Sequence, residues 1–236
     1  MLDYLNTRRR EAEWMDAPDA DPVMLHKSLA YIRRINSLLG YTRATLHHLE
    51  TLSRSWNAGE TIRIVDLATG SADIPRAILR WAQRRRFDVH MVGVDLHPKT
   101  AAEAAELRDS KLRVVRADVL DLPFADGSFD YAITNMFLHH LDDAQVVTVL
   151  KNMARVARRG VIVADILRNR RAYAWIVLLT LLANPMVRHD ARISVAQAFS
   201  PAEVMEIRDA AGLNFTAYHR HFGHRFVLAG EKNSCE

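Results

Sequence analysis

Three aspartates stand where short apolar runs of the sequence end, and their placement suits a nucleotide-like ligand. Asp66, Asp95 and Asp118 each lie at or just after such a run, and the carboxyl ends of neighbouring parallel strands meet at one edge of a sheet. A carboxylate at the tip of the second strand can accept hydrogen bonds from both hydroxyls of a ribose. One after the third strand can accept a hydrogen bond from an adenine amino group, while the alkyl side chain of Val119 flanks the ring. We therefore expect the three acids to share one cofactor site.

The loop after Asp66 supports this expectation. Residues 68–72 are all small, so a ligand can approach their backbone closely, and the helix that follows presents free N–H groups to an anion. Asp73 begins that helix, where an acid serves the helix dipole as readily as it serves a ligand. The loop suits a cofactor that carries a carboxylate or a phosphate.

The elements that must position these residues alternate between β-branched runs and helical segments, which is typical of a parallel sheet with crossover helices. The expected strands are 61–67, 89–95, 112–116, 129–135 and 160–166. The expected helices are 74–85, 99–107, 143–155 and 201–211. The last two runs, 214–218 and 225–229, predict an antiparallel hairpin at the sheet edge. The pattern predicts an α/β fold.

Residues 1–58 precede this alternation and have helical spacing. Apolar residues recur at the helical period from Met24 to Leu39, where Gly40 is a stop, and a second helix is expected from Thr42 to Trp56. We expect residues 1–58 to form a helical cover, and residues 59–236 to form one domain with an apolar helical insertion at about 169–199.

Four stretches of the chain resemble the class I S-adenosylmethionine-dependent methyltransferases. They are Asp66–Ala72, Asp95, Ala117–Asp118 and the segment Leu122–Asp130, which reads Leu-Pro-Phe-Ala-Asp-Gly-Ser-Phe-Asp. The resemblance covers about residues 62–166 and is greatest to the small-molecule branch that includes quinone-biosynthesis methyltransferases. It implies a Rossmann-like, mostly parallel seven-stranded sheet with an antiparallel last strand, and S-adenosylmethionine bound across the strand tips.

The same resemblance assigns roles to individual positions. Asp66 and the loop Ala68–Ala72 would hold the methionine part of the cofactor, Asp95 the ribose and Asp118 the adenine. The implied cofactor-binding residues are Asp66, Ala68, Thr69, Gly70, Asp95, Leu96, Asp118, Val119 and Asn135. The family loop commonly has glycine where this chain has Ala68 and Ala72, and each alanine adds one methyl group to the loop. The Gly-x-Gly-x-x-Gly pattern of nicotinamide-binding proteins is not present.

The segment after the fourth strand is where this family places residues that face the transferred methyl group. It contains His139 and His140. A neutral histidine can accept the proton of a phenol or another acidic hydroxyl, although adjacent residues on a helix point about 100° apart. A pair of structural histidines at a helix start is the alternative. His189, in the polar cluster 188–190, is a further candidate base.

The apolar stretch from Ala172 to Leu182 must be buried or must face an apolar partner. We expect a lid over an apolar substrate; core packing, a homodimer interface and contact with a membrane surface are the alternatives. Arg168, Arg170 and Arg171 precede it and could meet lipid headgroups or simply start a solvated helix. The stretch is shorter than the roughly 20 residues that cross a bilayer, so we expect no transmembrane segment.

Charge and cysteine usage limit the remaining classes. The formal net charge is +4, and only five of the 32 basic residues are lysines; the arginine excess keeps an RNA partner in view, but solvated faces explain it as well. The segment after the fourth strand lacks the Pro-Pro-aromatic motif of enzymes that methylate exocyclic base nitrogens, and Cys235, the single cysteine, is an implausible nucleophile at the chain end. We expect a cytoplasmic protein with no metal site and no nucleic-acid partner.

These observations predict an enzyme that transfers a methyl group from S-adenosylmethionine to an oxygen or carbon of a small, apolar or aromatic metabolite. The catalytic candidates are His139, His140 and His189. An RNA methyltransferase is one alternative. A binding or scaffold protein that keeps the fold without turnover is another, since fold does not fix function.

Overall fold

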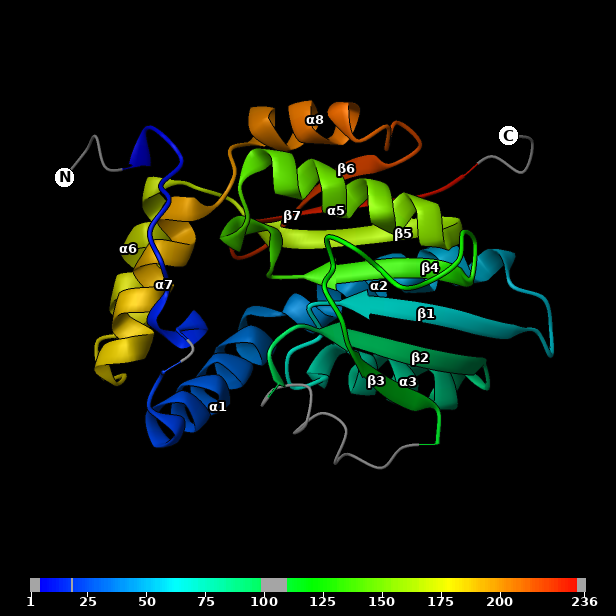
Figure 1. Cartoon of the computed structure of the whole chain (residues 1–236), viewed down its shortest axis with the longest axis horizontal. Coiled ribbons are helices and arrows are strands. Elements are labelled where there is room, and N and C mark those ends of the chain that lie inside the picture. Colours follow the sequence, from blue (N-terminus) through cyan, green and yellow to red (C-terminus); the bar gives the residue numbers. More distant parts are fainter. Residues whose placement is uncertain (1–4, 18, 99–109, 233–236) are drawn as a thin grey trace.

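A seven-stranded sheet forms the centre of the computed structural model, which describes residues 5–17, 19–98 and 110–232 (Figure 1). The strand order is β3-β2-β1-β4-β5-β7-β6. β7 runs antiparallel to both of its neighbours, and the other pairs are parallel. The strands are β1 (Thr61–Leu67), β2 (Asp88–Asp95), β3 (Leu112–Arg116), β4 (Phe129–Asn135), β5 (Ala157–Ile166), β6 (Ala217–His221) and β7 (Arg225–Glu231). The expected sheet, including its antiparallel last strand, is confirmed.

The strand register brings the carboxyl ends of the central strands to one edge. Leu67 of β1 pairs with Val94 of β2 and with Thr134 of β4, and Asn135 pairs with Ala164 of β5. β4 is almost wholly buried and β1 is buried from Ile64 onward, as expected of parallel strands covered on both faces. Residues that follow these strands therefore emerge side by side.

Helices cover both faces of the sheet (Figure 1). α2 (Tyr41–Leu52) and α3 (Asp73–Arg85) pack on one face, and α5 (Asp143–Val156) and α8 (Pro201–Ala210) pack on the other. α5 begins with a capping box, in which Asp142 and Gln145 exchange side-chain and backbone hydrogen bonds. α2 lies within the residues 1–58 that were expected to form a helical cover, and its Ala44 and Leu49 belong to the same core cluster as residues of the sheet.

A third group of helices lies beyond the carboxyl edge, on the left in Figure 1. It comprises α1 (Pro22–Leu39), α6 (Arg170–Leu179), α7 (Pro185–Gln197) and the short 3-10 turn η2 (Trp14–Asp16). α7 contacts α1, α6 and η2. No helix among the described residues is long and apolar enough to cross a membrane.

Most expected boundaries agree with the structure. β5 begins at Ala157 instead of at residue 160, and the helix expected to end at Trp56 ends at Leu52 and is followed by a 3-10 turn at Ser53–Ser55. Two further differences have local causes. β6 begins at Ala217 instead of at residue 214, because Thr216 turns back and donates both its backbone N–H and its hydroxyl to the Leu213 carbonyl. The apolar insertion forms two helices, because a new helix begins after Asn184. The side-chain oxygen of Asn184 accepts a hydrogen bond from Val187 N at 3.0 Å, and Pro185 occupies the first turn of the new helix. The expected helix over 99–107 and Cys235 lie outside the described residues.

Candidate active site

Asp66 lies beneath the loop that leaves β1. Its carboxyl group is buried and accepts a hydrogen bond from the Thr69 hydroxyl at 2.7 Å. Thr69 in turn packs on Gly93 of β2, where an added Cβ would come within 2.8 Å of the threonine side chain. Burial raises the pKa of Asp66 to about 8, and the nearby carboxylates of Asp73 and Asp95 add to this rise.

The backbone of this loop turns through the left-handed region at every second residue. Ala68, Gly70 and Ala72 have φ values of 55°, 55° and 54°. Ala72 is also the N-cap of α3 and offers that helix no side-chain acceptor. Nothing lies within 4 Å of the position where a Cβ would stand on Gly70. The loop therefore forms an open turn before a helix N-terminus, which suits an anionic group such as a carboxylate.

Asp95 at the end of β2 is joined directly to this loop. Its Oδ2 accepts from Gly70 N and its Oδ1 from His97 N, both at 2.9 Å. Each carboxylate oxygen has a further lone pair for a ligand hydroxyl. Leu96, the next residue, is 58% exposed, so an apolar side chain stands open beside the carboxylate.

Asp118 follows β3 and closes a tight turn. Its Oδ1 accepts from Leu120 N at 2.8 Å, while the neighbouring Val119 is buried. Asn152 of α5 holds this turn by donating to the carbonyl oxygens of Val119 and Leu120, at 3.1 and 2.9 Å. The three sequence-predicted carboxylates thus lie on adjacent strand ends, and two of them contact one loop.

Asn135 ends β4 and contacts the N-terminal helices. Its side-chain oxygen accepts from the Thr45 hydroxyl of α2 at 2.5 Å. Its Nδ2 is buried and has no hydrogen-bond partner among the described residues. A buried amide without an acceptor is costly, so this position fits a ligand that supplies one. Met136, the next residue, has a φ of 54° and turns the chain away from the strand.

His139 and His140 lie in η4 (Leu138–His140), and the structure gives them different surroundings. His139 is buried, and its Nδ1 is 2.7 Å from Asp165 Oδ1 at the end of β5. His140 is partly exposed. Burial alone would raise the pKa of Asp165, but the His139 imidazole and two backbone N–H groups lower it. Asp165 orients the His139 ring, as a carboxylate does for a catalytic base.

A second buried carboxylate faces both histidines from the N-terminal segment. Glu13 Oε1 lies 4.0 Å from His139 Nε2 and 3.9 Å from His140 Nδ1, and it accepts from the Ser194 hydroxyl of α7 at 2.6 Å. Glu13, His139 and His140 are the described residues whose side-chain atoms come near enough together to hold a metal ion. Arg8 from the same segment donates to carbonyl oxygens in and next to η4.

His189 is separate from this pair. Its ring stacks on Trp14 at 4.0 Å, and its Nδ1 lies 2.8 Å from Asp190. Asp190 is buried and also accepts from the backbone N–H groups of Trp14 and Met15. The structure therefore places His189 where it fastens the N-terminal segment to α7. Its role as a base stays a prediction.

Sequence reasoning missed Glu13, Thr45 and Asp165. Glu13 and Thr45 come from the N-terminal region, and Thr45 precedes the Asn135 that it contacts by 90 positions. No local pattern marks such partners. Asp165 had a usable signal, since it is an acid near the end of an expected strand, like the three acids that were found.

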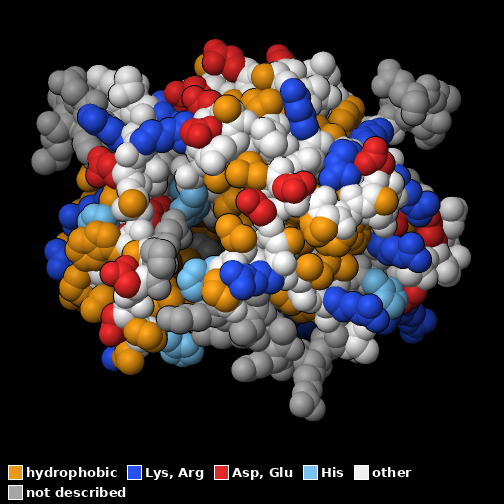
Figure 2. Space-filling model, viewed as in Figure 1, with side chains coloured by type: hydrophobic (Ala, Val, Ile, Leu, Met, Phe, Trp, Pro, Cys, Tyr) orange, Lys and Arg blue, Asp and Glu red, His pale blue; other side chains and the backbone are white. Residues whose placement is uncertain are grey.

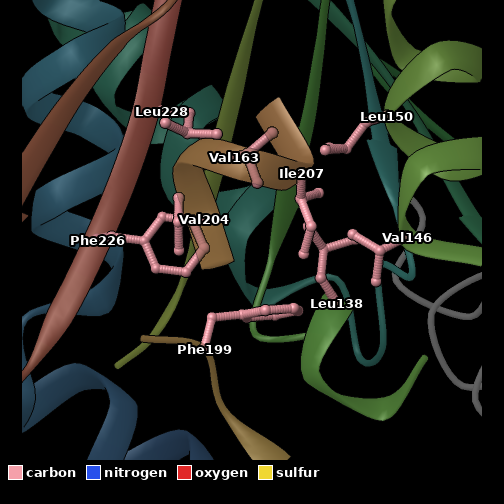
Figure 3. A pocket seen from close by; sticks show the side chains of 9 residues that line it. All are labelled: Leu138, Val146, Leu150, Val163, Phe199, Val204, Ile207, Phe226 and Leu228. Atoms are coloured by element: carbon pink, nitrogen blue, oxygen red, sulfur yellow. The ribbon is translucent and has the colours of Figure 1, made fainter. Parts of the chain in front are cut away.

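Figures 2 and 3 show two places where the structure leaves free space. The close-up in Figure 3 shows an interior void of about 10 Å³ lined only by apolar side chains between α5, α8 and the sheet. That volume holds at most one water, so the void is a packing gap and no substrate site. Figure 2 shows the molecular surface hollowed beside the α6–α7 pair, with histidine side chains at its rim.

Comparisons with known proteins agree with this geometry. Residues 64–160 match a family model described as "Methyltransferase domain". The chain is 32% identical over 149 residues to a demethylmenaquinone methyltransferase of Roseiflexus sp. (strain RS-1), an alignment that covers 58% of this chain and 60% of that protein. It is 33% identical over 172 residues to O-methyltransferase resE of Aspergillus sclerotiorum, covering 69% and 59% of the two chains. The aligned parts span 60% or less of these relatives.

Solved structures share the fold at low sequence identity. The plantazolicin methyltransferase BpumL in complex with SAH has a TM-score of 0.70 at 9% identity, and the match covers 93% of each chain. A SAM dependent methyltransferase from Aquifex aeolicus has a TM-score of 0.54 at 17% identity, covering 84% of this chain and 97% of that one.

Proposed function

We propose that this chain, whose residues 64–160 match a methyltransferase family model, transfers a methyl group from S-adenosylmethionine to an oxygen or carbon of a small apolar or aromatic metabolite. The observation that carries the proposal is the group of strand-end residues at one sheet edge: Asp95 tied to Gly70, the open left-handed turn, and the buried Asn135 amide without an acceptor among the described residues. The matched relatives' names, demethylmenaquinone methyltransferase and O-methyltransferase, support a small acceptor.

The residues at this edge fit the cofactor. The Ala68–Ala72 turn and the start of α3 would hold the carboxylate of its methionine part, with Asp66 close by. Asp95 would accept hydrogen bonds from the ribose hydroxyls, and Asp118 would accept one from the adenine amino group. Leu96 and Val119 would flank the adenine ring. Bound there, the cofactor supplies an electrophilic methyl group on a sulfonium. The main contribution of the protein to the transfer is positioning, since an aligned acceptor gains much of the rate without a covalent intermediate.

The acceptor must lose a proton if it is a hydroxyl, and the surroundings of η4 support a base there. We propose that His139, oriented by Asp165 through its Nδ1, takes this proton, with His140 beside it at the partly exposed rim. Glu13 stabilises the positive charge that the imidazole then carries, since an opposite charge within about 4–6 Å favours the charged form. His189 is assigned no step.

The apolar cover supports an apolar acceptor. Tyr41, Ile166, Val195 and Ala198 form a small core at the carboxyl edge, and Met136, Ala172, Tyr173 and Ile176 pack against it. One side of α6 therefore lies over the chain that leaves β4. A cover of this composition excludes water, which strengthens the electrostatic contacts of a reacting group beneath it.

Calorimetric titration of S-adenosylmethionine and S-adenosylhomocysteine tests the proposal. We expect micromolar affinity, about 8 kcal/mol, and a loss of about 10- to 100-fold in Asp95→Ala, which removes charge-assisted hydrogen bonds. Asp121→Ala, an exposed acid on the same edge, is the matched control and should bind as wild type does. No binding by the wild type would refute the proposal and favour the scaffold alternative. Binding without turnover on phenolic and quinol-like acceptors would refute the acceptor class alone.

A further inference from the structure

α6 exposes an apolar stripe on the side that faces away from the protein. Trp175, Leu178 and Leu179 are 59%, 56% and 40% exposed, and their spacing of three and four residues puts them on one helix face. The adjoining face carries Ala172, Tyr173 and Ile176, which pack toward the carboxyl edge. The exposed side of a surface helix is normally polar. The exposed side of α6 is apolar instead.

The stripe continues into the link between α6 and α7. Leu181 is 50% exposed and Leu182 is 99% exposed. Figure 2 shows hydrophobic side chains gathered over these helices, with Lys and Arg side chains, and some Asp and Glu side chains, next to them. A contiguous patch of this kind marks an interaction surface, whereas single exposed leucines do not.

The patch is held in place by α1. The Tyr31 hydroxyl donates to the Leu179 carbonyl at 2.7 Å, and Ser28 and Asn184 exchange hydrogen bonds at 3.0 and 3.3 Å. The side chain of Asn184 also caps α7. The leucines therefore project from an anchored turn and not from a free loop.

Charge decides what kind of partner fits. Exposed Arg170 and Arg171 stand at the start of α6, exposed Arg188 stands one turn into α7, and Lys27 is exposed on α1 beside Ser28. Within residues 167–199 the single acid, Asp190, is buried against the N-terminal segment, and the exposed acids just before α1 are Asp19 and Asp21, fewer than the four basic residues. A two-fold dimer through this patch would set basic rims against each other, because both copies present the same surface. A negatively charged surface removes that conflict.

We propose that α6 and the α6–α7 link dock on an anionic lipid bilayer, with Trp175, Leu178, Leu181 and Leu182 in the interface and the arginines at the headgroups. The inner face of α6 lies over the carboxyl edge, so docking places the candidate acceptor site next to the bilayer. An apolar acceptor dissolved in lipid then reaches the site without crossing water; this last step rests on the proposed function, whereas docking does not. Amphipathic helices that combine Trp and Leu with Arg bind anionic interfaces in this way.

Vesicle sedimentation with the full chain tests docking. We expect binding to vesicles that mix phosphatidylcholine with phosphatidylglycerol, at least about tenfold weaker binding to phosphatidylcholine alone, and weakening by added salt. Leu182→Glu should lower the affinity by about tenfold or more, since a charge replaces a fully exposed apolar side chain. Leu38→Glu is the matched control, because Leu38 is 78% exposed on α1, beyond that helix's contacts with the α6–α7 link, and it should bind as wild type does.

Two further readouts separate the outcomes. The fluorescence of Trp175, obtained as the difference between wild type and Trp175→Phe, should shift to shorter wavelength on anionic vesicles. Calorimetry without vesicles should give Leu182→Glu the cofactor affinity of wild type, so loss of docking is distinguishable from loss of the proposed function. Failure of wild type to sediment with either vesicle overturns the proposal. Equal binding to the two kinds of vesicle that does not change with salt also overturns it. So does a dimer, seen by light scattering, that Leu182→Glu dissociates when the wild type binds no vesicle.

Discussion

Replacing Asp66 by asparagine should stabilise the protein in the absence of cofactor, by an amount that grows with pH. Asp66 is buried, and its folded-state pKa of about 8 lies far above its ordinary value of 3.8. The unfolded chain therefore loses this proton near pH 4, while the folded chain keeps it up to about pH 8. Stability contributed by the protonated group is complete below about pH 4 and is lost as pH rises through that window.

The size of the effect follows from the linkage between protons and folding. Inside the window each pH unit costs the folded state about 1.4 kcal/mol, so the wild type should lose about 3 kcal/mol relative to Asp66→Asn between pH 5 and pH 7. Asparagine is nearly isosteric and keeps an acceptor for the Thr69 hydroxyl. The variant removes the ionisation and leaves the local hydrogen bond.

Urea unfolding followed by tryptophan fluorescence, at pH 5 and pH 7 without cofactor, measures this difference. Asp130→Asn is the comparison variant, because that buried carboxyl accepts from Arg63 N and Arg158 Nε at 2.8 and 2.7 Å. It should be less stable than wild type at both pH values, since it loses an ion pair. A difference between Asp66→Asn and wild type that does not change with pH would refute the reasoning.

Four further outcomes are expected. Ala68→Gly should raise the free energy of unfolding by about 0.5–1 kcal/mol in thermal melts. The left-handed backbone costs alanine about 1–2 kcal/mol, and part of that gain is offset because glycine has more conformational entropy to lose on folding. Ala72→Gly should gain less stability because the Ala72 methyl group is fully buried, and equal gains in the two variants would contradict this. Burial and the neighbouring histidines lower the pKa of His48 to about 4, so stability is lost as pH falls from 6.5 towards 4, and His48→Gln should flatten melting temperatures between pH 7 and pH 5. Asp165→Asn should lower kcat for a hydroxyl acceptor by about 100-fold and leave the calorimetric cofactor affinity unchanged, because Asp165 acts on the reaction through His139. A loss of cofactor affinity in this variant would point to a folding defect. Dialysis against a chelator should leave turnover unchanged, and its loss would assign a metal to the Glu13 group.

The carboxyl edge of the sheet could be predicted from the sequence because its signals are local. Asp66, Asp95 and Asp118 each follow an apolar run, and the parallel topology then brings distant runs to one edge. Strand bounds at 61–67, 112–116 and 129–135 agree with the structure for the same reason. Alternation and β-branching mark where a strand starts and stops.

The partners of the histidines could not be predicted, because nothing local encodes them. Glu13 reaches His139 only after the N-terminal segment has packed on α7, where Ser194 and Asp190 hold it. The left-handed angles at Ala68 and Ala72 were missed for the opposite reason. Alanine disfavours that conformation, so the sequence argues locally against the turn that the sheet and α3 impose.

Three costs coincide at the end of β1 and β4, and their coincidence bears on whether the chain turns over or only keeps the fold. Asp66 holds a carboxyl group where burial penalises its charge, the loop holds alanines in left-handed backbone, and Asn135 buries an amide with no acceptor among the described residues. A protein selected for stability alone would gain from an asparagine at position 66 and from a glycine at position 68. Such departures from local rules collect at ligand sites. Their grouping beside Asp95 therefore favours a bound cofactor over a scaffold without one, and the calorimetric titration of the wild type decides between the two.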